Sequence, residues 1–156
     1  RIPTIIDKLE REPTMQLSTM SDIGGARVRV ADLRSIAAVR RRLKKNDWKI
    51  ERVRDYIEHP KESGYRALHL IVNKDGRMIE IQLRTVRQHA WANTVERDSR
   101  VGAAGYKFGK GAPEVHAYYQ LVAEAFAILD RGETIGPAMS RDINKAHKRV
   151  RGAGSP

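Results

Sequence analysis

Alternating apolar and polar residues mark a strand near the middle of the chain. Across residues 79–85, the alternation puts two isoleucines and a leucine on one face and three polar side chains on the other: Glu80, Gln82 and Arg84. Successive residues on one face of a strand lie roughly 7 Å apart. Such a row of carboxylate, amide and guanidinium could hold a metal ion and phosphate oxygens. It could equally be the solvated face of an edge strand.

Elsewhere, apolar residues spaced three and four apart predict helices, and shorter alternating or apolar runs predict further strands. Helices are expected over residues 3–11, 32–45, 86–98 and 113–130, and strands over 26–30, 48–56, 66–73 and 77–84. Asp75-Gly76 predicts a tight hairpin between the last two strands. In the third helix, Ala90, Thr94 and Val95 are predicted to face inward. This order of elements predicts an α+β fold with a mixed, partly antiparallel central sheet flanked by helices.

The net charge narrows the range of partners. The chain of 156 residues has the length of one domain, and its 30 Lys and Arg against 19 Asp and Glu give a net charge of +11. Such a field attracts polyanions, including nucleotides, RNA and acidic proteins. No apolar run approaches the roughly 20 residues of a membrane span, and no signal-peptide pattern is present, so no membrane partner is expected. The absence of cysteine excludes disulfides and thiol catalysis and is compatible with a cytoplasmic location.

Asp22 is the first candidate for chemistry outside the central strand. It precedes Gly24-Gly25, where small residues let a ligand approach the backbone. Together with Glu80 it would form a two-carboxylate Mg²⁺ site, because Mg²⁺ is commonly held by one or two carboxylates plus substrate phosphates. The alternative is an ordinary turn aspartate that bonds its own backbone.

A second cluster combines cations, aromatic rings and a histidine between residues 54 and 69. Lys61 could bind phosphates, and Tyr65 could stack on a nucleobase or pack at the rim of the core. His69 lies on an apolar strand, which also fits a buried histidine with satisfied hydrogen bonds. The five histidines lack metal-ligand spacing, so no zinc site is predicted, and neither a Walker loop nor a Rossmann glycine fingerprint is present.

Taken together, these segments resemble the synthetase domain of the RelA/SpoT family of pyrophosphokinases. The matching segments occur in the family's order across residues 1 to about 111: Asp22-Ile23-Gly24-Gly25-Ala26-Arg27, Arg54-Asp55-Tyr56-Ile57 with Pro60-Lys61, Gly64-Tyr65-Arg66-Ala67-Leu68-His69, Ile79-Glu80-Ile81-Gln82-Leu83-Arg84-Thr85 and, more loosely, His89, Trp91-Ala92 and Tyr106-Lys107.

The resemblance implies a nucleotidyltransferase-like fold and a specific reaction. A synthetase domain would span residues 1–135, followed by a basic C-terminal helix or tail over 136–156. The reaction would be the Mg²⁺-dependent transfer of the β,γ-pyrophosphate of ATP to the 3′-hydroxyl of GDP or GTP, giving (p)ppGpp-type alarmones.

The resemblance also implies a role for each matching residue. Asp22 and Glu80 would be the catalytic and metal-binding pair, with Glu80 either binding the metal or acting as general base on the 3′-hydroxyl. Lys8 would reach the ATP phosphates, and Arg27 would stack on adenine. The acceptor would be bound by Tyr65, Lys61, His69, Gln82 and Arg84.

Two departures from the family pattern leave other functions open. Basic ATP-site residues usually stand just upstream of the segment that here begins at Arg1, so we expect further residues before it. The Glu-His pair common after the tryptophan reads Val95-Glu96-Arg97. The net charge of +11 and the basic residues over 40–45 and 145–151 support one alternative, a toxic small synthetase that pyrophosphorylates the 3′ end of tRNA, with an antitoxin protein as partner. Another is an inactive relic of the fold that binds RNA or a protein. A homo-oligomer fits each of these functions.

Overall fold

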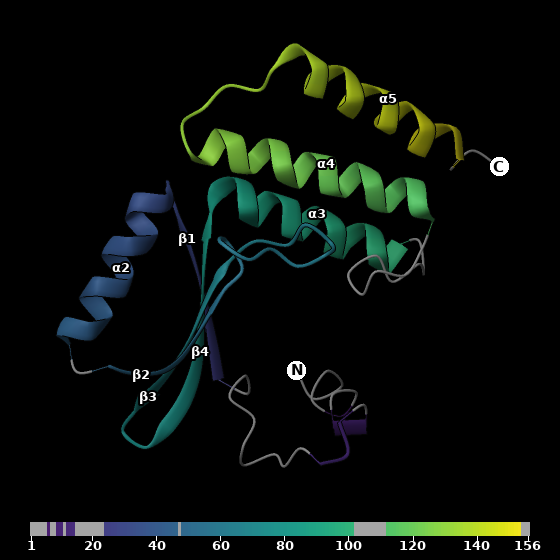
Figure 1. Cartoon of the computed structure of the whole chain (residues 1–156). Helices are drawn as coiled ribbons and strands as arrows, with labels where there is room; N and C mark the ends of the chain where they lie inside the picture. Colours follow the sequence, from purple (N-terminus) through teal and green to yellow (C-terminus); the bar gives the residue numbers. More distant parts are fainter. Residues whose placement is uncertain are drawn as a thin grey trace.

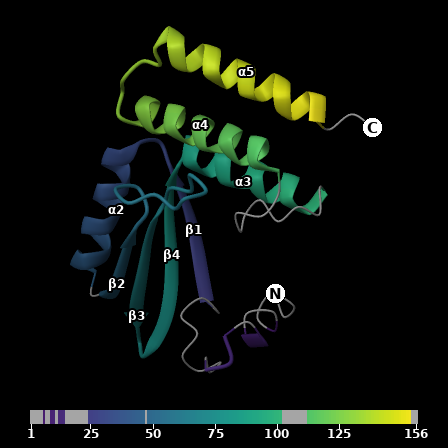
Figure 2. The same ribbon diagram turned by 45° about the vertical axis from the view of Figure 1, so that its right-hand side comes forward.

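The computed structural model describes residues 6, 9–10, 12–14, 24–46, 48–101 and 112–153, and the strands among them form one four-stranded sheet. The strands lie in the spatial order β1-β4-β3-β2 (Figures 1 and 2). β1 runs parallel to β4, whereas β3 pairs antiparallel with both β4 and β2. Their bounds are β1 Gly24–Val30, β2 Lys49–Asp55, β3 Leu68–Lys74 and β4 Arg77–Thr85. The mixed sheet confirms the predicted α+β fold.

The hairpin between β3 and β4 forms where the sequence predicts it. Asp75 and Gly76 both have positive φ angles, 52° and 76°. Positive φ at both central residues is the requirement of the two-residue turn that matches the twist of antiparallel strands. The turn sets the register of β3 against β4, so that His69 lies directly opposite Gln82.

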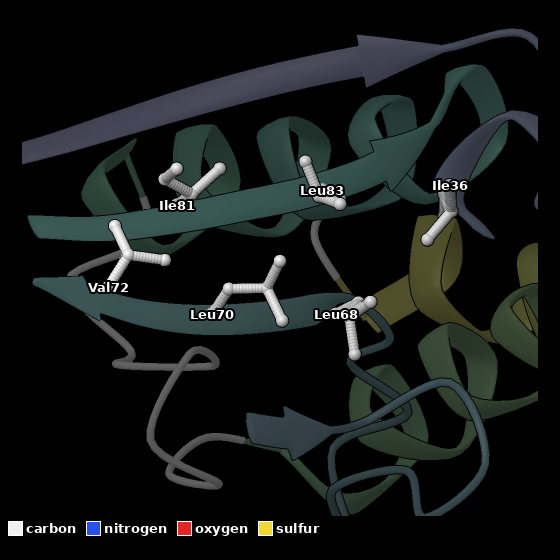
Figure 3. Close-up of a cluster of buried hydrophobic side chains, with 6 residues drawn as sticks. All are labelled: Ile36, Leu68, Leu70, Val72, Ile81 and Leu83. Carbon is white, nitrogen blue, oxygen red and sulfur yellow. The ribbon is translucent and has the colours of Figure 1, made fainter. Parts of the chain in front are cut away.

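Helix α2 (Leu33–Lys45) covers one face of the sheet (Figure 2). Asp32 caps its first turn by accepting a 2.7 Å hydrogen bond from the backbone N–H of Ser35. Ile36 enters a core built with alternate residues of β3 and β4, as Figure 3 shows; the members of this cluster are Ile36, Leu68, Leu70, Val72, Ile81 and Leu83. Because the apolar residues of both strands point to α2, their polar neighbours lie on the opposite face.

Helices α3 (Val86–Val101), α4 (Pro113–Asp130) and α5 (Pro137–Ala153) stack side by side at the end of the sheet (Figure 1). Trp91 of α3 packs against Tyr119 of α4 and donates a 2.8 Å hydrogen bond to its carbonyl oxygen. Val95 is buried as predicted, whereas Ala90 is exposed and that prediction is wrong. The phase of α3 is set at its start, where Gln88 accepts from the backbone N–H of Thr85 and turns Trp91 inward.

The predicted elements within the described residues are confirmed, with boundaries that shift by two or three residues at most. Most of the predicted helix over residues 3–11 lies outside the described residues. A helix begins at Pro137, where the basic C-terminal segment was expected; the division into a domain over 1–135 and a segment over 136–156 stays a prediction. Among the described helices, none is both long enough and apolar enough to cross a membrane.

Candidate active site

The sheet face opposite α2 brings together polar side chains from three strands. His69 of β3 lies opposite Gln82 of β4, and Arg27 of β1 is also in register with Gln82. Glu80 and Arg84 lie two residues to either side of Gln82 on the same face. Residues predicted from separate parts of the sequence therefore meet on one surface.

Glu80 lies on this face and is held by two hydrogen bonds. Its Oε1 is 3.0 Å from Nδ1 of His69, and its Oε2 accepts a 2.9 Å bond from Nε2 of Gln82. The hydrogen bond with His69 is the largest cause that lowers the pKa of Glu80 to about 2, with Gln82 and the charge of Arg54 adding to it and burial opposing it. The side chain is only 12% exposed, yet it is a carboxylate anion at neutral pH.

Tyr65 lies beside this carboxylate, at the end of the loop that leads into β3. Its hydroxyl is 2.7 Å from Nε2 of His69 and accepts a 2.7 Å bond from the guanidinium of Arg84. Two cations lie near the ring: Nζ of Lys61 at 5.5 Å and Cζ of Arg84 at 5.0 Å from its centroid. Tyr56 packs edge-on against Tyr65 with the ring centroids 5.9 Å apart. Burial raises the pKa of the Tyr65 hydroxyl, which is therefore neutral at physiological pH.

A cavity of about 250 Å³ opens between this sheet face, the loop and helix α3. Five of the predicted acceptor residues line it, and so does Arg27, predicted for ATP. The lining also includes Trp91, Ala92, Val95 and Glu96 of α3 and Ser63 of the loop. None of these five residues was predicted to bind a ligand. Trp91 and Ala92 belonged to the loose family match, Val95 and Glu96 to the departure from the family's Glu-His pair, and nothing in the sequence marked Ser63.

The cavity has a cationic environment. Arg27 and Arg84 line it, and Nε of Arg84 is a buried donor without a hydrogen-bond partner among the described residues. Burial is the first cause that lowers the pKa of the nearby His89, followed by the positive charges of Arg84, Arg27 and Arg29. His89 is therefore neutral at physiological pH, and the arginines remain as the charges that attract an anionic ligand.

The predicted metal pair can be judged only at Glu80, because Asp22 lies outside the described residues, as does Lys8. Among the described residues, no group of three His, Cys, Asp or Glu side chains could hold a metal ion by itself. Glu80 still fits a Mg²⁺ ligand: a carboxylate has about four lone-pair sites, and two hydrogen bonds leave sites free for a cation. Mg²⁺ is typically held by one or two carboxylates plus substrate phosphates and water. The donor set therefore suits Mg²⁺ bound together with a nucleotide.

A larger cavity, of about 450 Å³, lies on the other face of the sheet between α2 and the turn after β2. Its apolar lining includes Leu33, Ile36 and Leu68, and its cations are Arg40, Arg41 and Lys44 of α2. Within the described part of the chain, no hydrogen bond joins two of its lining side chains, in contrast to the network around Glu80. Because binding sites combine shape with convergent polar groups, we assign the chemistry to the smaller cavity despite its size.

Comparison with known proteins identifies similar chains. A family model described as a region found in RelA / SpoT proteins matches residues 1–101. The GTP pyrophosphokinase YjbM of Bacillus subtilis is 33% identical over 141 residues, which cover 83% of this chain and 64% of the relative. The chain thus spans slightly less than two thirds of the length of that relative.

Two solved structures resemble the fold closely. The small alarmone synthetase 2 of Bacillus subtilis has a TM-score of 0.71 and 28% identity, covering 85% of this chain and 73% of that one. The small alarmone synthetase 1 of the same organism, crystallised with its product pppGpp, has a TM-score of 0.65 and 26% identity. The match covers 100% of this chain and 76% of that one.

Proposed function

The chain belongs to the RelA/SpoT family, and from that premise we propose that it is a pyrophosphokinase which transfers the β,γ-pyrophosphate of ATP to the 3′-hydroxyl of GDP or GTP. A relative named as a GTP pyrophosphokinase and a similar structure that holds pppGpp support this substrate class. The observation that carries the proposal is the cavity lined by the neutral Tyr65 together with Arg27, Lys61 and Arg84. The anionic Glu80 lies beside it, hydrogen-bonded to the lining residues His69 and Gln82.

Transfer of a pyrophosphoryl group asks for positioning and for cations more than for covalent chemistry. Developing negative charge on phosphate oxygens is stabilised by fixed positive groups in a partly dry site. Lys61 and Arg84 border the ring of Tyr65, so they can neutralise the phosphates of an acceptor whose base lies against that ring. Arg27, exposed on the neighbouring β1, lies on the ATP side in this proposal, together with Lys8.

Glu80 and Asp22 would hold the Mg²⁺ ion. When bound, the ion would supply a Lewis acid that stabilises negative charge on the phosphates. The hydrogen bonds to Glu80 favour its charged form, which is the form that binds a cation. A carboxylate with a pKa of about 2 is a weak proton acceptor at neutral pH, so of the two roles expected for Glu80 we favour metal ligand over general base.

The acceptor can be identified with labelled ATP. Purified protein is incubated with Mg²⁺ and ATP labelled in the γ-phosphate, and is offered GDP, GTP, the 3′-deoxy form of GDP, and deacylated tRNA in separate reactions. We expect label in GDP and GTP and none in the 3′-deoxy compound, which lacks the attacking hydroxyl. Label in tRNA alone would replace guanine nucleotides with the tRNA end as acceptor, a result that the basic surface of α2 would help to explain. No label in any acceptor would refute the proposal.

A further inference from the structure

Five polar side chains of the site close a ring of hydrogen bonds. Starting from Glu80, the ring passes to His69 at 3.0 Å and from His69 to the hydroxyl of Tyr65 at 2.7 Å. It continues to Arg84 at 2.7 Å, then to Gln82 at 3.0 Å, and returns to Glu80 at 2.9 Å. The side chains come from the loop before β3, from β3 and from β4, so the ring links three segments of the chain.

The chemistry of the members fixes the direction of four of the five bonds, and the neutral form of His69 sets the fifth, between His69 and Tyr65. Glu80 is ionised and can only accept, so His69 donates to it from Nδ1. Nε2 of a neutral imidazole then accepts, and the Tyr65 hydroxyl donates to it while accepting from Arg84. The amide of Gln82 donates to Glu80 and accepts from Arg84 through its oxygen. Two arms therefore run from the guanidinium to the carboxylate, one through Tyr65 and His69 and one through Gln82.

Packing leaves the ring little freedom. His69 is 8% exposed and Arg84 is 5% exposed. Tyr56 contacts both members of the longer arm edge-on, with its centroid 5.9 Å from that of Tyr65 and 5.2 Å from that of His69. Chains of hydrogen bonds in a poorly solvated site polarise and strengthen one another. A change in the χ1 angle of Tyr65 would move its hydroxyl and break the arm there.

We propose that His69 is a positioning residue, which ties the aromatic ring of Tyr65 to the Glu80 carboxylate and so fixes where the acceptor base lies relative to the metal-binding oxygens. This inference rests on the proposed function. It gives His69 a role other than the direct acceptor contact expected from the resemblance, because both of its ring nitrogens are engaged within the ring. Small errors in such a distance are costly, since misplacement by about 1 Å can reduce a rate by about 100-fold.

A double-mutant cycle tests the role in catalysis. His69→Asn keeps a short amide donor for Glu80 but places no acceptor at the position of Nε2, where the Tyr65 hydroxyl is bound. Tyr65→Phe keeps the aromatic face and removes the hydroxyl. Both variants break the same bond, so each should lower kcat by about tenfold, with the acceptor KM changed by less than about threefold. The kcat of the double variant should lie within about twofold of the kcat of either single variant. His147→Asn, on the exposed side of α5, is the matched control and should retain wild-type kinetics.

A spectroscopic measurement tests the ring without activity. In ¹⁵N-labelled protein at about pH 8, above the usual histidine pKa, His69 should show a protonated Nδ1 and an unprotonated Nε2, and Tyr65→Phe should shift the Nε2 resonance. A double variant about 100-fold slower than wild type, or a proton on Nε2 of His69, would overturn the proposal. A chain that transfers no label but shows the expected tautomer and shift would refute the proposed function while the ring itself stands.

Discussion

Replacing Glu80 by Gln should make the stability of the protein depend less on pH. The amide has nearly the same shape as the carboxylate, but it carries no charge and can no longer accept hydrogen bonds from both His69 and Gln82. The folded state lowers the pKa of Glu80 from 4.5 to about 2. The charged carboxylate therefore contributes about 3 kcal/mol to the free energy of unfolding at neutral pH.

The sign follows from the direction of the pKa change. Because the folded-state pKa is the lower one, this contribution is complete above pH 4.5 and is lost as the pH falls towards about 2. At about pH 3, roughly 2 kcal/mol of it should be gone. The difference in unfolding free energy between wild type and Glu80→Gln should thus be about 2 kcal/mol smaller at about pH 3 than at about pH 7.

Urea unfolding followed by circular dichroism, in metal-free buffer, measures this difference at both pH values. Because the two chains share all their other carboxylates, the contributions of those groups to the free energy of unfolding cancel when the chains are compared at the same pH. Glu124→Gln changes a half-exposed carboxylate on α4 and is the control; its difference from wild type should vary by less than about 0.5 kcal/mol. If the difference in unfolding free energy between wild type and Glu80→Gln were the same at both pH values, His69 and Gln82 would not hold the carboxylate in its charged form.

Three further substitutions test the surroundings of the site. Gly64→Ala should lower the free energy of unfolding by more than about 2 kcal/mol in thermal or urea unfolding, because Gly64 has a φ of 88° and the new Cβ would lie 2.8 Å from a side chain of α4. Gly132→Ala is the control: its φ is 81°, but no atom lies within 4 Å of the new Cβ, so the loss should be only about 1 kcal/mol. Equal losses for the two variants would contradict this reasoning. Thr85→Val should lower the free energy of unfolding in urea by about 2 kcal/mol, because it removes the 2.6 Å hydrogen bond that Thr85 donates to the buried carboxylate of Asp130. An unchanged free energy of unfolding would argue against that bond. Lys61→Met should raise the acceptor KM by about tenfold in steady-state assays with little change in kcat, whereas an unchanged KM would separate Lys61 from acceptor binding.

The polar face of the sheet could be predicted because it depends on local patterns. Alternation in β4 fixes the side on which Glu80 and Arg84 lie, and Asp75-Gly76 fixes the hairpin that aligns β3 with β4. Given those two features, His69 must share a face with Glu80. The grouping of His69, Gln82 and Arg84 with Glu80 therefore follows from strand geometry alone.

The hydrogen-bonded ring could not be predicted because it depends on side-chain torsions and on the loop before β3. The sequence left His69 open as a buried histidine or a ligand contact; its buried position and two hydrogen bonds match the first, and ligand contact stays a prediction. The error at Ala90 has a similar origin. Helix periodicity gives spacing, but the phase of α3 is set by the Thr85–Gln88 cap and by the packing of Trp91 on α4.

The most direct test of the central claim compares wild type with Glu80→Gln in the transfer of label from γ-labelled ATP to GTP, with circular dichroism confirming that both chains are folded. We expect labelled pppGpp from wild type in the presence of Mg²⁺ and at least about a 100-fold lower rate from the variant, because one carboxylate of the proposed metal pair is lost. Equal rates from the two chains would contradict the account, since Glu80 would then take no part in the reaction. A wild-type chain that transfers nothing, yet binds RNA or a protein equally well with and without the Glu80 charge, would identify it as a binding relic of the fold.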